Sequence, residues 1–180
     1  MKIGFDIDGV IVDTISNCAK GISKHLGYEV SCEDVVYRFE EMYEAHDFWS
    51  KNSRVFLCSI PPYDGVCEHI NELIKSHEIY FISARGYEVL EDSKIWFEKH
   101  GLPTENIYFT SGETKTGICK ELELDLFIED SPKNAEEISL TGIPVLLMDT
   151  EYNRDYNGEK IVRCKDWDDL IEKISKFNKK

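Results

Sequence analysis

The sequence contains no apolar run of ~18 residues, which is about the length that a helix needs to cross a bilayer. It also lacks the cationic start, short apolar segment and small-residue cleavage site of a secretory leader. Its six cysteines stand singly, with no C-x-x-C pair and no zinc-like spacing with histidine. We therefore expect a soluble, cytoplasmic protein that has reduced thiols and no membrane partner.

Basic residues are scarce, since Lys and Arg total 21 against 35 Asp and Glu, and the net charge is −14 at pH 7. Such a surface repels the phosphates of nucleic-acid polymers, which we exclude as partners. A small anionic substrate stays possible if a few cations and a metal ion reverse the field locally. The 180 residues show no repeat or flexible linker, and 42% of them are hydrophobic, which predicts one folded domain with at most a small insertion.

The first fourteen residues, MKIGFDIDGVIVDT, lead two carboxylates into a glycine turn. Side chains at i and i+2 of an extended segment point the same way, so Asp6 and Asp8 are predicted to lie on one side. Two close carboxylates in a partly dry site either share a proton or bind a cation, and Mg²⁺ suits their oxygens. One of them could attack phosphorus while the other acts as general acid and base. In the simpler interpretation, both acids only decorate a turn.

A second polar segment, Ser83-Ala84-Arg85-Gly86, follows an apolar run at 78–82 that predicts a buried strand. Ligands of open α/β sheets bind at the carboxyl ends of the strands, so the Ser83 hydroxyl is well placed to bind a phosphate oxygen. Arg85 could add a bidentate phosphate contact or could form only a surface ion pair. We expect Ser83, Ala84 and Arg85 to bind substrate.

Lys115 stands at the start of a helix predicted over 116–122. A lysine is unfavourable at the positive end of a helix dipole, so an anion should compensate it. A phosphoryl group or the carboxylates would do so. Lys120 is the alternative candidate, but it fits an exposed helix cation better, so we favour Lys115.

Two more acids, Glu129 and Asp130, end a strand predicted over 125–128. They could cap the helix that follows, but Ser131 and Pro132 already provide its start signal. The acids are therefore free to join those that follow the first strand.

The pattern D-I-D-G-V-I-V-D-T resembles the first motif of the haloacid dehalogenase (HAD) superfamily of Mg²⁺-dependent phosphohydrolases. Ser83 is similar to the second motif of that superfamily and Lys115 to the third. The pair Glu129 and Asp130 resembles the fourth motif in its Glu-Asp form. The four motifs follow in order and cover nearly the whole chain.

This resemblance implies a role for each residue. Asp6 is the nucleophile, Asp8 is the general acid and base, and the serine and lysine hold the transferring oxygens. The implied Mg²⁺ is bound by Asp6, Asp8 and Asp130 directly and by Glu129 through water.

Strands that alternate with helices predict an α/β fold with a parallel sheet. The resemblance adds a three-layer, Rossmann-like sheet with a small helical cap inserted after the first strand and helix. We expect residues 1–14 and 64–180 to form the core and residues 15–63, here called the helical insertion, to form the cap. Residues 161–162 are predicted as an edge strand.

Three helices are predicted in and around the helical insertion. Asp13 fits a helix cap better than a metal ligand, Ser31 has the acids of a capping box behind it, and Asp47 is predicted to open the third helix.

Aromatic residues of the helical insertion, above all Phe48 and Trp49, could stack on a planar group or could form the insertion's own core. The segment I-E-D-S-P-K-N looks similar to 5′(3′)-deoxyribonucleotidase-like proteins. The resemblance implies a Mg²⁺-dependent phosphatase acting on (deoxy)nucleoside monophosphates through an aspartyl phosphate. Two alternatives stay open, namely a phosphatase for a sugar phosphate or another small phosphomonoester, and a phosphate-binding regulatory module without turnover.

Overall fold

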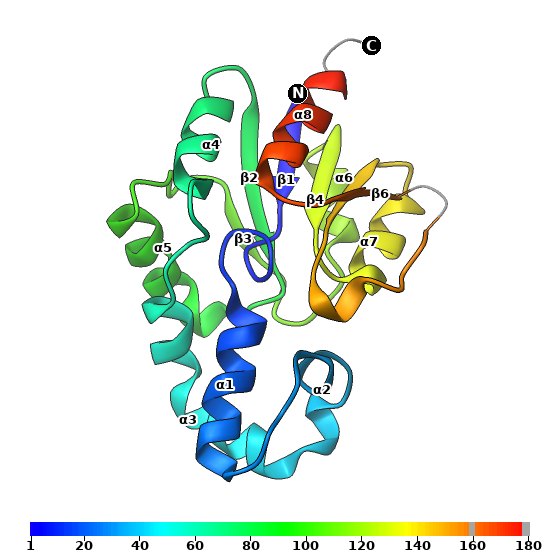
Figure 1. Cartoon of the computed structure of the whole chain (residues 1–180). Helices are drawn as coiled ribbons and strands as arrows, with labels where there is room; N and C mark the ends of the chain where they lie inside the picture. Colours follow the sequence, from blue (N-terminus) through cyan, green and yellow to red (C-terminus); the bar gives the residue numbers. More distant parts are fainter. Residues whose placement is uncertain (159–160, 178–180) are drawn as a thin grey trace.

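A six-stranded parallel sheet with the strand order β3-β2-β1-β4-β5-β6 forms the centre of the molecule (Figure 1). The computed structural model describes residues 1–158 and 161–177. The strands are β1 (Lys2–Phe5), β2 (Glu78–Ser83), β3 (Ile107–Phe109), β4 (Leu126–Glu129), β5 (Val145–Met148) and β6 (Ile161–Cys164). The predicted parallel α/β fold is confirmed, and the edge strand expected at 161–162 is β6.

The helices and 3₁₀ turns connect these strands. They are α1 (Thr14–Leu26), α2 (Cys32–Tyr37), η1 (Phe39–Glu41), α3 (Tyr43–Ser59), α4 (Val66–Leu73), η2 (Tyr87–Val89), α5 (Leu90–Lys99), α6 (Thr116–Glu121), α7 (Pro132–Ser139), η3 (Glu151–Asn153) and α8 (Trp167–Phe177). No helix among the described residues has the length and apolar character that crossing a bilayer requires. All six cysteines are free thiols, as expected.

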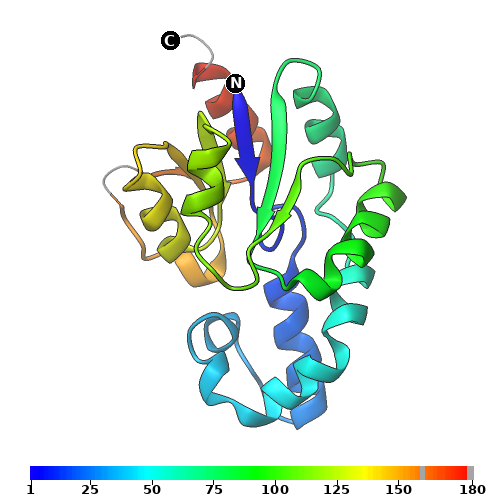
Figure 2. The same ribbon diagram turned by 180° about the vertical axis from the view of Figure 1, so that it is seen from behind.

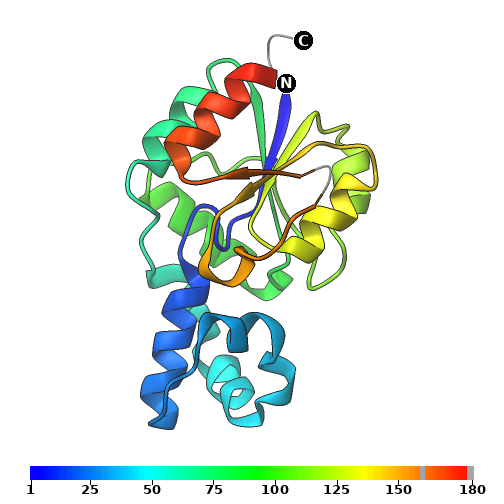
Figure 3. The same ribbon diagram turned by 45° about the vertical axis from the view of Figure 1, so that its right-hand side comes forward.

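Helices cover both faces of the sheet, because side chains along a strand point to its two faces in turn. On one face, Phe5 and Phe81 pack with α4, α5 and α8, and on the other Ile82 and Phe127 pack with α6 and α7 (Figure 3). Burying each such side chain contributes about 1.5–3 kcal/mol. The three-layer arrangement is thus confirmed, and it fixes the strand ends that carry the polar residues.

Gly4 in β1 is required by this packing. A Cβ at this position would lie 2.5 Å from Cδ2 of Phe127, whose ring covers the strand there. The missing side chain lets that ring close the core directly below the end of β1.

Helices α1, α2 and α3 lie beyond the carboxyl ends of the strands, at the end of the molecule opposite the N-terminus and α8 (Figure 2). They have a small core of their own, in which Ile22, Val30 and Ala45 are buried. This agrees with a helical insertion placed over the sheet edge, while its limits at 15 and 63 stay a prediction.

Two helix starts follow the sequence closely. The Asp13 carboxylate accepts a hydrogen bond from the Ser16 backbone N–H at 3.2 Å, so Asp13 caps α1. Ser31 and Asp34 form a capping box at the start of α2. Local polar signals therefore set these two helix starts.

The predicted start of the third helix at Asp47 is wrong. Helix α3 begins at Tyr43, and Asp47 lies inside it, where its carboxylate pairs with Lys51 Nζ at 2.7 Å. Met42, at the start of α3, makes no capping hydrogen bond with its side chain. The first turn is instead held by burial of Ala45 in the core of the helical insertion. No nearby residue in the sequence predicts this burial.

Candidate active site

The carboxyl ends of β1, β2 and β4 bring the predicted site residues together at one edge of the sheet. Parallel pairing aligns these ends because β1 lies between β2 and β4. The side chains brought together are those of Asp6, Asp8, Ser83, Lys115, Glu129 and Asp130. The structure therefore places these six predicted residues in one site.

Lys115 is the lysine that the structure brings to this site, whereas Lys120 is exposed on α6. The Lys115 Nζ lies 2.9 Å from Asp6 Oδ1 and 2.9 Å from Glu129 Oε2, and its side chain is 1% exposed. Burial by itself lowers the pKa of Lys115, but the charges of Asp6 and Glu129 outweigh burial and raise that pKa above its ordinary value. The ammonium group therefore stays charged.

Asp6, Glu129 and Asp130 form a buried cluster of three carboxylates, in which one oxygen from each lies within 4.8 Å of the others. Burial raises the pKa of Asp6 and holds that of Glu129 well above its usual range. Burial and the neighbouring Asp6 charge raise the pKa of Asp130 to about 8. One lysine thus faces three carboxylates, and a divalent cation bound by these oxygens would neutralise the negative charge that the lysine does not balance.

Asp8 does not join this cluster, because its carboxylate pairs with Arg85. Arg85 Nη2 lies 2.7 Å from Asp8 Oδ1, and Nε lies 2.9 Å from Oδ2. The hydroxyls of Thr14 and Ser83 also donate to this carboxylate. Burial favours a higher pKa for Asp8, but Arg85 and the hydroxyls outweigh it and lower the pKa.

Arg85 forms an ion pair, as one of the two alternatives expected, but the pair is buried and not on the surface. Its side chain is 3% exposed, and Nη1 donates to Ser93 Oγ at 3.1 Å. A fork of this kind also matches the oxygens of a phosphate group.

Asp130 is supported by residues that the sequence analysis did not find. The Tyr152 hydroxyl donates to Asp130 Oδ2, and Asn153 Nδ2 donates to the Asp130 carbonyl at 2.7 Å. Arg163 Nη1 in turn donates to Asn153 Oδ1 at 2.7 Å. Gly9, at φ +81°, leaves room for these groups, because a Cβ there would collide with the Asp130 carboxylate.

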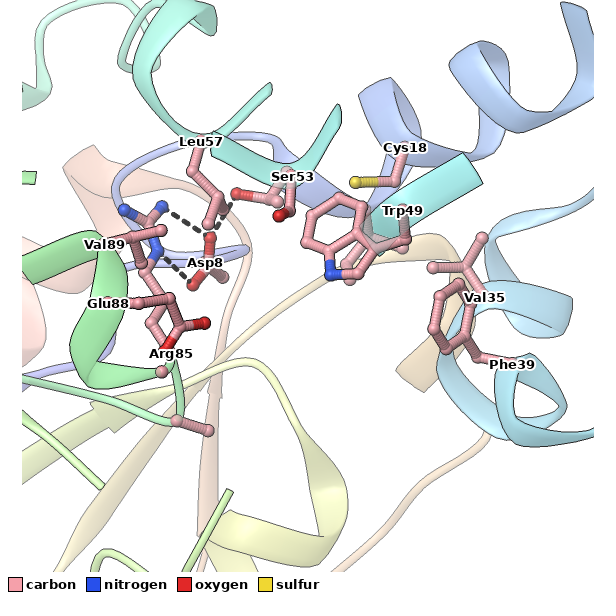
Figure 4. A pocket seen from close by; sticks show the side chains of 14 residues that line it. Asp8, Cys18, Val35, Phe39, Trp49, Ser53, Leu57, Arg85, Glu88 and Val89 are labelled. Carbon is pink, nitrogen blue, oxygen red and sulfur yellow. Dashed lines mark hydrogen bonds and ion pairs between the residues drawn. The ribbon is translucent and has the colours of Figure 1, made fainter. Parts of the chain in front are cut away.

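A cavity of about 350 Å³ opens beside Asp8 and Arg85, between the helical insertion and the segment that follows β2 (Figure 4). Its wall is mainly apolar, and Ala84 and Trp49 contribute to it together with Phe39, another aromatic residue of the helical insertion.

Phe48 lies elsewhere, packed against Phe56 with ring centroids 5.6 Å apart in the helical insertion's own core. Of the two aromatic candidates, Trp49 therefore reaches the cavity and Phe48 does not.

Comparison with known proteins gives consistent results. A family model described as "5′ nucleotidase, deoxy (Pyrimidine), cytosolic type C protein" matches residues 1–179. A putative nucleotidase from Halalkalibacterium halodurans is 30% identical over 173 residues, which cover 92% of this chain and 88% of that protein.

Similar solved structures include a HAD-like hydrolase from Streptococcus pneumoniae, with a TM-score of 0.70 and 16% identity over 98% of this chain and 97% of that chain. A HAD family hydrolase from Deinococcus radiodurans with bound phosphate and sodium has a TM-score of 0.67 and 14% identity over 98% and 96% of the two chains. The fold resemblance to the HAD superfamily is therefore confirmed. Because the family model matches nearly the whole chain, the protein, which has a HAD-like fold, belongs to this 5′-nucleotidase family and is an enzyme of the phosphatase, or nucleotidase, class.

Proposed function

We propose that the protein hydrolyses (deoxy)nucleoside monophosphates with Mg²⁺ and through an aspartyl-phosphate intermediate. The observation that carries this proposal is how the two oxygens of the Asp6 carboxylate are bonded. Its Oδ1 is held by Lys115 and by the Ile7 backbone N–H at 2.7 Å, whereas no described residue donates a hydrogen bond to its Oδ2. An anchored carboxylate with one uncommitted oxygen is suited to attack phosphorus.

The cluster of Asp6, Glu129 and Asp130 supports a site for Mg²⁺, because a hard cation prefers oxygen ligands and the cluster carries excess negative charge. Asp6 and Asp130 would hold the ion directly and Glu129 through water. Bound Mg²⁺ would screen the repulsion between an anionic nucleophile and a phosphate. The Asp8 carboxylate would reach such an ion only by leaving Arg85.

In the first step, an Asp6 oxygen bonds to phosphorus, the ester P–O bond breaks, and Asp8 gives a proton to the leaving alkoxide. In the second step, Asp8 takes a proton from water, which attacks phosphorus and releases phosphate from Asp6. Ser83 and Lys115 hold the phosphoryl oxygens.

The pairing with Arg85 favours the ionised form of Asp8, which suits the second step better than the first. A substrate phosphate that competes for the Arg85 guanidinium would restore the proton affinity of Asp8.

The cavity beside Asp8 supports a nucleoside as the leaving group. Its volume of about 350 Å³ and its aromatic residues Phe39 and Trp49 suit a planar base. A sugar phosphate would leave these rings without a partner. The free thiols also suit a reducing compartment, and we propose the cytoplasm.

The test is a panel of phosphomonoesters, assayed with Mg²⁺ and with EDTA. We expect hydrolysis of nucleoside monophosphates faster than of sugar phosphates, and loss of activity with EDTA. Faster hydrolysis of sugar phosphates would leave a phosphatase and remove the nucleotidase. Folded wild-type protein without turnover on any member would instead favour the phosphate-binding module.

A further inference from the structure

Two polar side chains in the cavity wall, the half-buried Ser53 and the exposed Glu88, have no partner in the described parts of the chain. Five residues with a charged or hydroxyl side chain line the cavity, and two of these, Thr14 and Arg85, donate hydrogen bonds to a third, Asp8. The other two are Ser53 and Glu88, and neither side chain makes a hydrogen bond or ion pair with another residue in the described parts of the chain, 1–158 and 161–177. They are free to contact a ligand.

Glu88 gives the cavity a negative charge that its neighbours do not neutralise. It lies on η2 next to Arg85 (Figure 4), but the Arg85 guanidinium is occupied by Asp8 and Ser93. The Glu88 carboxylate folds back over Gly86, where a Cβ would collide with it. The missing side chain at Gly86 therefore lets the carboxylate lie against the wall next to the site.

The opposite wall is apolar and carries the ring of Trp49 (Figure 4). A leaving group that enters the cavity from Asp8 therefore meets an aromatic face on one side and a carboxylate on the other. A carboxylate accepts hydrogen bonds and donates none, so it selects hydroxyl and amino groups. It also repels a second anion, and because the Glu88 side chain is exposed, water and salt screen part of this repulsion.

We propose that Glu88 is a specificity residue that accepts a hydrogen bond from a hydroxyl or amino group of the leaving nucleoside and rejects leaving groups that carry a second phosphate. This inference rests on the proposed nucleotidase activity. It predicts that the enzyme hydrolyses nucleoside monophosphates in preference to nucleoside 3′,5′-bisphosphates.

The structural alternative is that Glu88 only serves the start of the helical segment η2–α5, where an acid is favourable. In that case its replacement changes stability and affects all substrates alike. The two possibilities therefore differ in how the effect depends on substrate.

The experiment compares Glu88→Gln, which removes the charge and keeps an acceptor, with Glu88→Ala, which removes both. Glu98→Gln, at an exposed position of α5 outside the cavity, is the matched charge control. The full chain is assayed with Mg²⁺ on a deoxynucleoside 5′-monophosphate, its 3′,5′-bisphosphate and para-nitrophenyl phosphate.

We expect Glu88→Ala to lose about tenfold in kcat/KM on the monophosphate and to change little on para-nitrophenyl phosphate, since one charge-assisted hydrogen bond is lost. We expect Glu88→Gln to raise kcat/KM for the bisphosphate relative to the monophosphate by about tenfold, because the repulsion is relieved. Glu98→Gln should match wild type on all three.

The inference would be overturned if the Glu88 variants changed kcat/KM equally on all substrates. It would also be overturned if Glu88→Gln left the ratio of kcat/KM for the bisphosphate to that for the monophosphate unchanged. If wild type hydrolyses no nucleotide, the proposed function fails separately, and inhibition of para-nitrophenyl phosphate hydrolysis by the bisphosphate still tests the charge. Glu88→Gln must then bind the bisphosphate about tenfold more tightly than wild type, and equal inhibition constants would refute the role of Glu88.

Discussion

Two aspartates separated by a single residue have opposite electrostatic surroundings in this protein. Asp6 shares one lysine with Glu129 and Asp130, and burial raises the pKa of all three acids. Asp8 has the fork of Arg85 to itself, and its pKa is lowered. The surroundings of Asp6 hold one lysine against three acids, and this excess of negative charge suits a bound cation. The surroundings of Asp8 are neutralised by Arg85 and open to the cavity, so we propose that they bind the leaving group.

The strongest test of this comparison is to remove the Asp6 carboxylate, which we propose as the nucleophile. Asp6→Asn should lower turnover by about a thousandfold or more, because an amide is too poor a nucleophile to form the acyl phosphate. Circular dichroism checks that the near-isosteric variant is folded. A folded variant with wild-type turnover would take the nucleophilic role away from Asp6.

Removing the shared cation should destabilise the Asp6 surroundings. Lys115→Met leaves three buried carboxylates without their counter-ion and should cost about 3–5 kcal/mol in the free energy of unfolding, measured by urea denaturation without metal. Lys120→Met, on the exposed side of the same helix, is the matched control and should change little. Equal losses in both variants would show that the Lys115 contacts contribute nothing specific.

Replacing an acid in each environment should change stability in opposite directions at pH 7. Asp8→Asn leaves the Arg85 charge buried without its counter-ion and should cost about 3 kcal/mol. Asp130 has a raised pKa, so its ionised form opposes folding above the pKa of the unfolded chain, and Asp130→Asn should raise the melting temperature without metal.

Mg²⁺ separates these two variants further. It should stabilise wild type and Asp8→Asn in thermal melts, but Asp130→Asn much less, since a proposed metal ligand is lost. An equal Mg²⁺-induced shift in all three proteins would remove Asp130 from the metal site.

The smallest expected effect concerns the cavity on the Asp8 side. Trp49→Ala should lower kcat/KM on a nucleotide by about tenfold to hundredfold relative to para-nitrophenyl phosphate, because base stacking contributes about 1–3 kcal/mol. Phe48→Ala is the matched control. It should lower thermal stability and affect both substrates alike, as its core position implies. Equal losses on both substrates in Trp49→Ala would make Trp49 a core residue too.

The sequence by itself determined the parallel α/β fold, the helix starts at Asp13 and Ser31, and the candidate acids and lysine of the site. These features depend on signals within a few residues, such as strand alternation, capping groups and the unfavourable lysine at a helix start. Strand ends of a parallel sheet then meet at one edge whatever the details of packing, which is why distant motifs could be combined correctly.

Only the tertiary structure decided which groups pair within that site. Arg85 meets Asp8 across 77 positions of sequence, and Tyr152 meets Asp130 across 22. It also placed Trp49 in the cavity, although its neighbour Phe48 has the same aromatic character. Each outcome depends on how separate elements pack against one another, and a side chain's partner across such a contact leaves no trace in its local sequence.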